Sequence, residues 1–339
     1  MRNKLLSQMK THYSLVTART ALSAWQLIQS LHKNYHTPSD EIIKSWKVKL
    51  DEVAAHEMSK ALHEIPFSTL KVGSEGDKEV AKDGAPGASV KGSFGKDTNQ
   101  KLWGVSDVIE GTTPAAQNKP GASSVIAVTE VNGIMPTPKG KHYSLRLIGP
   151  PQAKGAMSLD QDHATNLDNL IQILKIHPHE LIQVTMNPKD REINQKYIDS
   201  AKKVGVRLKI IDLGTFMPEI RASLDPEKFG YEPLIFVGRG GFEEGTMAMA
   251  AAKAVGGFAE MRLFDANPKI MNNNPLWTLD EHIVKGKKEL TLVSASFITP
   301  DNQWFHKPGV RMNKDKSFTV TTLAITHKGP IFKEIKLLT

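Results

Sequence analysis

The spacing of apolar residues predicts two long helices at the beginning of the chain. Over residues 4–31, apolar positions recur every three to four residues, as on the buried face of a helix. Residues 40–63 repeat this pattern, with Pro38-Ser39-Asp40 as a start signal and Pro66 just beyond the end. The apolar face of the first segment consists of Val16, Ala21, Leu22, Trp25, Leu27 and Ile28.

The following residues carry loop and strand signals. Residues 77–100 are rich in Gly, Lys, Asp and Ser, which predicts that they are mostly loop. In residues 123–135, SSVIAVTEVNGIM, an apolar run precedes Asn132-Gly133, and this predicts a hairpin with a return strand.

Past about residue 155, predicted strands alternate with predicted helices. The strands are 181–186, 206–212, 233–238 and 259–264, the helices are 190–205 and 246–257, and residues 288–338 are rich in β-forming runs. This alternation is typical of a partly parallel sheet flanked by helices. We therefore expect an α/β fold.

The composition is that of a globular protein without disulfides. The 339 residues are enough for two domains, and 40% of them are hydrophobic, which allows a sizeable core. The chain has no cysteine, so a disulfide framework and thiolate chemistry are excluded. No apolar run approaches the roughly 20 residues that a membrane-spanning helix needs.

The net charge of +8 lies at the two ends of the chain. Residues 1–50 hold eight Lys or Arg against two acids, and residues 301–339 hold seven against three, so the middle is slightly acidic. Basic residues do not alternate with aromatics, as they do in a nucleic-acid-binding surface. We interpret the basic ends as solvated faces. The first 39 residues lack acids, as a transit peptide does, but their apolar stripe favours core packing.

Four places in the sequence combine acids with a tight backbone. They are Asp51 on the second predicted helix, Glu75 after a short strand, Asp107 and Glu110 in WGVSDVIEGTT, and Glu243 and Glu244 in FVGRGGFEEGT.

The D-x-x-E motif of residues 107–110 is a candidate metal site. A strand that ends in a turn there can aim Asp107 and Glu110 at one point. Oxygen ligands with no Cys or His nearby suit Mg²⁺ or Mn²⁺. Gly111 lets the backbone approach a ligand closely, and Thr112 offers a hydroxyl and an N–H where a phosphoryl oxygen would lie. The alternative is an acidic turn that caps a helix beginning at Thr112 or Thr113.

The segment around Glu244 has the outline of a phosphate-binding loop, with a strand, a glycine-rich turn and a helix. Position 243 is glutamate, however, where G-x-G-x-x-G requires glycine. Two glutamates at a helix start favour a divalent cation over a bare phosphate. The sequence therefore disfavours a dinucleotide-binding fold.

These motifs resemble a known family. DVIEGTT is similar to the D-P-I-E-G-T signature of class II fructose-1,6-bisphosphatases, in the metal-dependent, lithium-sensitive phosphatase superfamily. The resemblance continues in the family's order through SLVTARTALSAW (14–25), LDEVAAHEMSKALHEIP (50–66), VGSEGD (72–77), YSLRLIGPPQAKG (143–155), VTMNPKDR (184–191), GVRLKIIDLGT (205–215) and GRGGFEEG (238–245).

The resemblance implies a layered sugar-phosphatase fold with mixed sheets between helix layers. It implies two subdomains, residues 1–155 with the metal-binding carboxylates and residues 156–339 with contacts to the substrate phosphate. The implied cofactors are two Mn²⁺ or Mg²⁺ ions per active site, one held by Asp51 and Glu75 and the other by Asp107, Glu110 and Glu244.

The resemblance also implies residues that contact the substrate and the attacking water. The implied substrate-binding residues are Glu110, Gly111, Thr112, Tyr143, Lys189, Asp190, Arg191, Leu213, Gly214, Thr215 and Gly241. The candidates for catalysis are Thr112 and either Asp77 or Glu79 for positioning water, with Lys47 neutralising charge nearby.

The chain departs from the family pattern at two places that matter. The family's Gly-Asp-Lys segment before the first metal aspartate is WKVKLD here, with Lys47 at the place of the lysine and an apparent insertion before it. The family's D-G-D turn, which contacts the sugar, is Leu213-Gly214-Thr215. The metal ligands are thus present while the sugar-binding carboxylates are replaced.

We therefore expect a metal-dependent phosphatase that hydrolyses the 1-phosphate of fructose 1,6-bisphosphate in gluconeogenesis. One alternative is another sugar bisphosphate, such as sedoheptulose 1,7-bisphosphate. The other is a degenerate paralogue that binds a phosphorylated ligand without turnover. The expected protein is cytoplasmic and forms a homo-oligomer, a dimer or tetramer. Its partner is a small-molecule sugar bisphosphate, with neither nucleic acid nor membrane as a partner.

Overall fold

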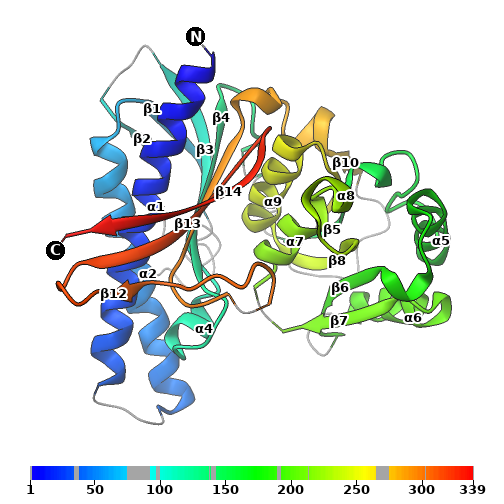
Figure 1. Ribbon diagram of the computed structural model, residues 1–339, viewed down its shortest axis with the longest axis horizontal. Helices are drawn as coiled ribbons and strands as arrows, with labels where there is room; N and C mark the ends of the chain where they lie inside the picture. The colour runs from blue at the N-terminus through cyan, green and yellow to red at the C-terminus, as the bar shows by residue number, and fades with distance from the viewer. Residues whose placement is uncertain are drawn as a thin grey trace.

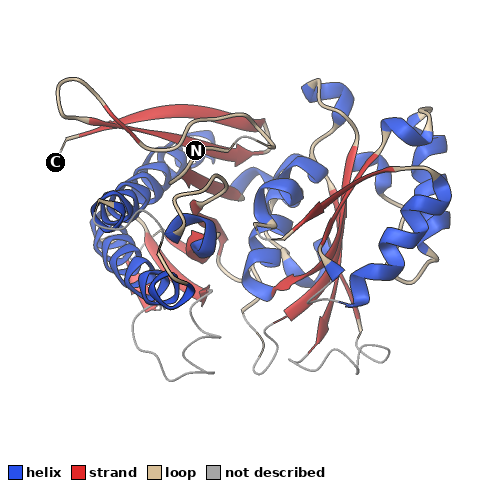
Figure 2. Cartoon of the chain, turned by 90° about the horizontal axis from the view of Figure 1, so that it is seen from below, coloured by secondary structure: helices blue, strands red, loops and turns tan. Residues whose placement is uncertain are grey.

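Helices and sheets alternate in layers across the molecule (Figures 1 and 2). The computed structural model describes residues 2–33, 38–74, 92–96, 100–136, 138, 143–188, 192–212, 214–264, 275–301 and 303–338. Within these residues, two mixed sheets lie between helices, as expected for an α/β fold.

The first sheet is assembled from both ends of the chain. Its strands are β1 (Ser68–Ser74), β2 (Gly92–Phe94), β3 (Lys101–Glu110), β4 (Ser123–Glu130), β11 (Leu292–Phe297), β12 (Arg311–Met312), β13 (Phe318–Thr326) and β14 (Gly329–Leu337). They follow the order β12-β13-β11-β4-β3-β1-β2, with β14 paired to β13. β1 and β3 run parallel, and the other pairs are antiparallel.

The two predicted N-terminal helices, α1 (Arg2–His32) and α2 (Asp40–Glu64), cover one face of this sheet. The Ser39 side chain caps α2 by accepting a hydrogen bond from the Ile42 N–H, as its start signal predicts. The apolar stripe of α1 is in the core, and the Thr17 hydroxyl bonds the hydroxyls of Ser294 and Ser296 on β11.

The predicted hairpin at residues 123–135 is wrong in its second strand. β4 forms, and Asn132 takes a left-handed turn conformation with φ 60°. The described residues 133–136 form no return strand, because both edges of β4 are already paired, one with β3 and the other with β11. The Met135 N–H instead donates to the carbonyl of Ile283.

The second sheet lies within the middle of the chain. Its strands are β5 (Tyr143–Gly149), β6 (Ile182–Met186), β7 (Arg207–Ile211), β8 (Leu234–Gly241), β9 (Phe258–Phe264) and β10 (Leu276–Thr278), in the order β10-β9-β5-β8-β6-β7. β6 runs parallel to β7 and β8, which confirms the prediction of a partly parallel sheet. The helices α5 (His163–Leu174) and α6 (Gln195–Val204) pack on its outer face.

A layer of helices fills the space between the two sheets. It contains α7 (Phe216–Ser223) and α9 (Phe242–Val255), and α9 contacts strands of both sheets. The residues of α9 are buried on nearly every side, which explains its run of small and flexible side chains in TMAMAAAKA. α9 thus joins the two sheets at the place where the predicted carboxylates lie.

Short helical segments complete the fold. They are α4 (Thr112–Ala116), α8 (Pro226–Phe229), η1 (Pro151–Ala153), η2 (Pro178–Glu180), η4 (Glu192–Asn194), η6 (Leu279–Ile283) and η7 (Lys288–Leu290). In the described ranges, no helix has both the length and the apolar character that crossing a bilayer requires.

The sheets do not divide the chain at a single point near residue 155. β5 already belongs to the second sheet, and β11 to β14 return to the first. The division into subdomains 1–155 and 156–339, with its assignment of roles, stays a prediction. Of the predicted loop 77–100, residues 92–94 form β2, and residues 77–91 and 97–99 lie outside the described residues.

Candidate active site

Two of the predicted metal ligands project from the end of β3. In a regular strand, side chains three residues apart point to opposite faces. The pairing of β3 with β4 shifts its register between Asp107 and Glu110, and such an irregularity re-aims side chains. The Asp107 carboxylate also accepts a hydrogen bond of 3.0 Å from the Ile109 N–H. Both carboxylates are therefore fixed in one direction by the backbone of the strand end.

The turn after β3 requires its glycine. Gly111 has φ 81°, and a Cβ there would lie 2.9 Å from the carbonyl oxygen of Gly121. Thr112 then begins α4, and its hydroxyl donates to the Asp51 carboxylate on α2 over 3.3 Å. The turn thus starts a helix and also gathers acids, so the two sequence interpretations of this motif are compatible.

The third carboxylate comes from the middle layer. Glu244 lies in the first turn of α9, where its carboxylate accepts a hydrogen bond of 3.0 Å from the Gly241 N–H. Asp107, Glu110 and Glu244 each offer an oxygen, and these three atoms all lie within 4.8 Å of one another. Residues separated by 137 positions in the sequence therefore meet as an all-carboxylate group that fits a hard divalent cation.

The three carboxylates are unfavourable neighbours without a cation. Asp107 and Glu110 are each 4% exposed, so water screens their charges poorly. Burial raises the pKa of Glu110 well above its usual range, and the charges of Glu244 and Asp107 raise it further. The donor types, the burial and the repulsion all fit a site for Mg²⁺ or Mn²⁺.

Two basic residues behind the cluster, Arg146 and Lys71, were not predicted from the sequence. The Arg146 guanidinium on β5 lies 2.7 Å from the carboxylate of Glu219 and 4.0 Å from that of Glu244. Lys71, buried on β1, donates to the hydroxyl of Ser106, the neighbour of Asp107. Each residue interrupts an apolar strand sequence, Arg146 in SLRLI and Lys71 in TLKVG. A charged residue within such an apolar run is the sequence signal that could have identified them.

Burial raises the pKa of Glu219 well above its usual range, and the adjacent Arg146 opposes this effect. Both side chains are 0% exposed. They form a buried ion pair next to the carboxylate cluster.

Other predicted residues lie around the cluster without joining it. Tyr143 is opposite Gly241 in the pairing of β5 with β8, and the Arg239 guanidinium lies 4.5 Å from its ring centre. Thr215 is buried and its hydroxyl accepts from Arg146, so its side chain faces the protein interior. Lys47 lies on α2 one helical turn before Asp51.

The remaining predictions fall outside the described residues. They concern Glu75, Asp77, Glu79, Lys189, Asp190, Arg191 and Leu213.

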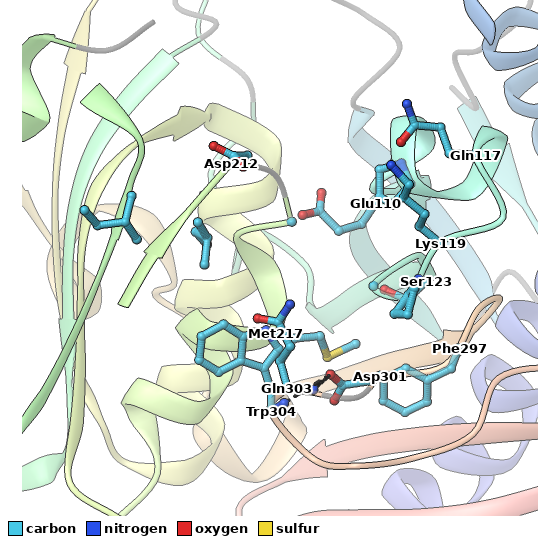
Figure 3. Close-up of a pocket in the computed structure, with 16 residues that line it drawn as sticks. Glu110, Gln117, Lys119, Ser123, Asp212, Met217, Phe297, Asp301, Gln303 and Trp304 are labelled. Atoms are coloured by element: carbon cyan, nitrogen blue, oxygen red, sulfur yellow. Dashed lines mark hydrogen bonds between the residues drawn. The ribbon is translucent and has the colours of Figure 1, made fainter. Parts of the chain in front are cut away.

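A pocket of about 360 Å³ adjoins the cluster (Figure 3). Its walls include Glu110 of the cluster together with Lys119, Gly214, Asp301 and Trp304. This volume lies in the range of small-ligand sites. Much of its lining comes from residues 117–123 and from residues 301, 303 and 304, which were not singled out from the sequence.

Comparison with known proteins identifies the family. The sequence model described as "Bacterial fructose-1,6-bisphosphatase, glpX-encoded" matches residues 40–336, and the chain belongs to this family. The resemblance stated from the motifs is therefore confirmed.

The relatives are 26–28% identical to this chain over the aligned stretches. Proteins named "D-fructose 1,6-bisphosphatase class 2/sedoheptulose 1,7-bisphosphatase" match it in Synechococcus elongatus (26% identical over 197 residues, 58% of this chain and 54% of the relative) and in Synechocystis sp. (26% over 228 residues, 65% and 64%). A relative of the same name from Synechococcus sp. strain JA-3-3Ab is 28% identical over 221 residues, 63% of this chain and 61% of the relative. Each match thus spans less than two thirds of the relative's length.

Proposed function

We propose that this chain is a metal-dependent phosphoric monoester hydrolase that removes the 1-phosphate from a sugar bisphosphate. The observation that carries this proposal is the convergence of Asp107, Glu110 and Glu244 within 4.8 Å, beside the Gly111-Thr112 turn. Family membership supports the same chemistry.

A divalent ion bound by these carboxylates supplies Lewis acidity and charge neutralisation for phosphoryl transfer. The chain's own residues orient the reacting groups. The Thr112 hydroxyl lies within hydrogen-bond distance of two acceptors, the Asp51 carboxylate at 3.3 Å and the Ile109 carbonyl at 3.0 Å, which hold it beside the cluster. We assign Thr112 and the Gly111 backbone to the phosphate, and Glu75 with Asp51 to a second ion.

Water must attack phosphorus in line with the leaving oxygen, and a side chain has to orient it. Asp77 or Glu79 is the proposed residue for this task. Lys47, one turn before Asp51 on α2, is the proposed cation that balances the charge of the departing phosphate.

We propose fructose 1,6-bisphosphate as the substrate, and sedoheptulose 1,7-bisphosphate as the second candidate. The names of the cyanobacterial relatives contain both activities. The substituted turn at Leu213-Gly214-Thr215 favours weak binding of the sugar hydroxyls, because neither side chain at 213 or 215 is a carboxylate.

The test is phosphate release from a panel of sugar mono- and bisphosphates with Mg²⁺ or Mn²⁺. The wild type should release phosphate from a bisphosphate, and Glu110→Gln should abolish this release, because it removes one charge from the ion site while keeping the side-chain shape. Glu130→Gln is the matched control, since Glu130 lies at the far end of β4, where its carboxylate accepts the Lys287 N–H.

The degenerate paralogue makes a different prediction. It would release no phosphate from any sugar in the panel, yet a bisphosphate with metal would still raise its melting temperature. Release well above the Glu110→Gln background eliminates that alternative.

A further inference from the structure

Arg146 occupies the inner face of the second sheet. Its neighbours on β5, Leu145 and Leu147, pack in the outer core under α5 and α6. Because side chains alternate along a strand, Arg146 points to the other face, into the helical layer between the sheets. It is 0% exposed there.

The guanidinium of Arg146 links the two helix starts that frame the site. One nitrogen donates to the Gly241 carbonyl over 2.6 Å, at the start of α9. The other nitrogen donates to the Thr215 hydroxyl over 3.2 Å and lies 2.7 Å from the Glu219 carboxylate. Thr215 and Glu219 both lie at the beginning of α7.

The glycines of GRGGFEEG make room for this arginine. A Cβ on Gly245 would lie 2.5 Å from both Cδ and Nη1 of Arg146, and one on Gly240 would overlap its guanidinium. Neither glycine has a positive φ. Their lack of a side chain is therefore explained by the volume of Arg146 rather than by backbone conformation.

We propose that Arg146 is a positioning residue for the metal ligand Glu244. Gly241 is held from both ends, because its carbonyl accepts from Arg146 and its N–H donates to the Glu244 carboxylate. Arg146, itself fixed by Glu219, thereby sets the place of Glu244 before any ion arrives. The proposal rests on the metal site assigned above, and it does not depend on which phosphate is hydrolysed.

The charge of Arg146 and its role in positioning Glu244 predict opposite effects on metal affinity when Arg146 is removed. A guanidinium 4.0 Å from the Glu244 carboxylate repels a nearby cation, so its loss should tighten metal binding if only charge mattered. If Arg146 positions Glu244, its loss should weaken metal binding. Removing Arg146 together with Glu219 takes away one charge of each sign, so charge alone then predicts little change in metal affinity, whereas loss of positioning still predicts weaker binding.

The experiment is a titration with Mn²⁺, followed by the electron paramagnetic resonance signal of free Mn²⁺, without any sugar phosphate. The test variant is the double substitution Arg146→Met/Glu219→Met, which leaves no unpaired buried charge. We expect its Mn²⁺ affinity to fall by about tenfold or more, as for other residues that support metal ligands. Unchanged or tighter binding by a cooperatively folded double variant overturns the proposal.

Arg262→Met is the matched control. Arg262 lies on β9 directly opposite Leu145, so it belongs to the other face of the same sheet, and it pairs with Asp160. Its loss should leave Mn²⁺ affinity unchanged.

Arg146→Lys keeps the proposal testable if the double variant does not fold. A lysine retains the charge for Glu219 but cannot make all the contacts of the guanidinium fork. We expect Mn²⁺ affinity between those of the wild type and the double variant, and affinity equal to or tighter than the wild type overturns the proposal. Since no sugar phosphate is present, this result stands apart from the phosphate-release test. An active enzyme can fail it, and an inactive chain can pass it.

Discussion

Two groups of buried charges lie one behind the other between the sheets, and they differ in how their charge is balanced. In front, Asp107, Glu110 and Glu244 bring three carboxylates within 4.8 Å. Behind them, Arg146 and Glu219 form a pair in which a cation meets an anion at 2.7 Å. The front group has an excess of negative charge and the rear group contains its own counter-ion.

This difference separates a binding site from its support. A group with unbalanced charge costs stability until an external ion neutralises it, so it is retained for function. A balanced pair fixes geometry without attracting a ligand. The four predictions below test this comparison: the first concerns loss of activity, and the other three concern stability, from the largest expected change to the smallest.

The front group should be essential for activity. Glu244→Gln keeps the hydrogen bond to the Gly241 N–H but removes one charge. We expect phosphate release to fall by about 100-fold or more, a loss of roughly 2.7 kcal/mol of transition-state stabilisation. Glu227→Gln, on the exposed helix α8, should leave the rate unchanged. A Glu244→Gln enzyme with near wild-type rates would contradict the assigned site.

Removing one member of the rear pair should destabilise the protein much more than replacing both members with apolar residues. Glu219→Leu leaves the Arg146 guanidinium buried without its partner, and we expect the free energy of unfolding to fall by about 3–5 kcal/mol. Arg146→Met/Glu219→Met removes both charges and should cost less than about 1.5 kcal/mol. Urea denaturation measures both values. Equal losses for the two variants would show that the ion pair is not the source of the effect.

A buried histidine elsewhere extends the comparison to a titratable group that is buried in its neutral form. His163 is buried on α5 and bonds Gln183, and burial lowers its pKa to about 4. Its folded pKa lies below the unfolded value of 6.5, so its contribution is fully present above pH 6.5 and is lost as pH falls toward 4. The loss reaches on the order of 3 kcal/mol.

We therefore expect a flatter pH dependence of stability between pH 7 and 4.5 in His163→Gln. The raised pKa of Glu110 works in the opposite direction in the metal-free protein, since protonation of Glu110 relieves repulsion as pH falls. Melting curves recorded in the presence of a chelator measure both trends. Parallel curves for the wild type and His163→Gln would contradict the assignment to His163.

The smallest effect is expected at Thr215. Thr215→Val keeps the shape and removes one acceptor from Arg146, which retains its contacts with Gly241 and Glu219. We expect a loss of about 1 kcal/mol in the free energy of unfolding. Mn²⁺ affinity should not change, and a large change would mean that Thr215 contributes more to the metal site than this single contact indicates.

The sequence predicted the parts of this protein that local patterns determine. The two N-terminal helices, four strands of the second sheet (β6 to β9) and the body of α9 follow from periodicity and from signals at element ends, although α9 begins at Phe242, four residues before its predicted start. The hairpin after β4 was wrong because its pairing is decided by β11, about 165 residues further along the chain. Strand partners at such distances leave no local signal.

The same limit applies to the candidate site. The acidic motifs at 107–110 and 243–244 were recognised because their residue types are unusual and close together. Arg146 was missed because its importance arises from Gly241 and Glu219, which lie 73 or more positions away. The pocket joins residues 117–123 to residues 301, 303 and 304, and no periodic pattern relates these two parts of the chain.

The assembly of the first sheet from both ends of the chain has a consequence for biosynthesis. Strands β5 to β9 lie within residues 143–264 and can pair as soon as that stretch has left the ribosome. β4 cannot gain its second neighbour, and α1 cannot make its bonds to Ser294 and Ser296, until the last third of the chain is translated. The nascent chain therefore carries an open β4 edge while residues 131–291 are synthesised, and such an edge can pair with other chains. Synthesis of β11 to β14, more than any local folding step, therefore completes the sheet that carries Asp107 and Glu110.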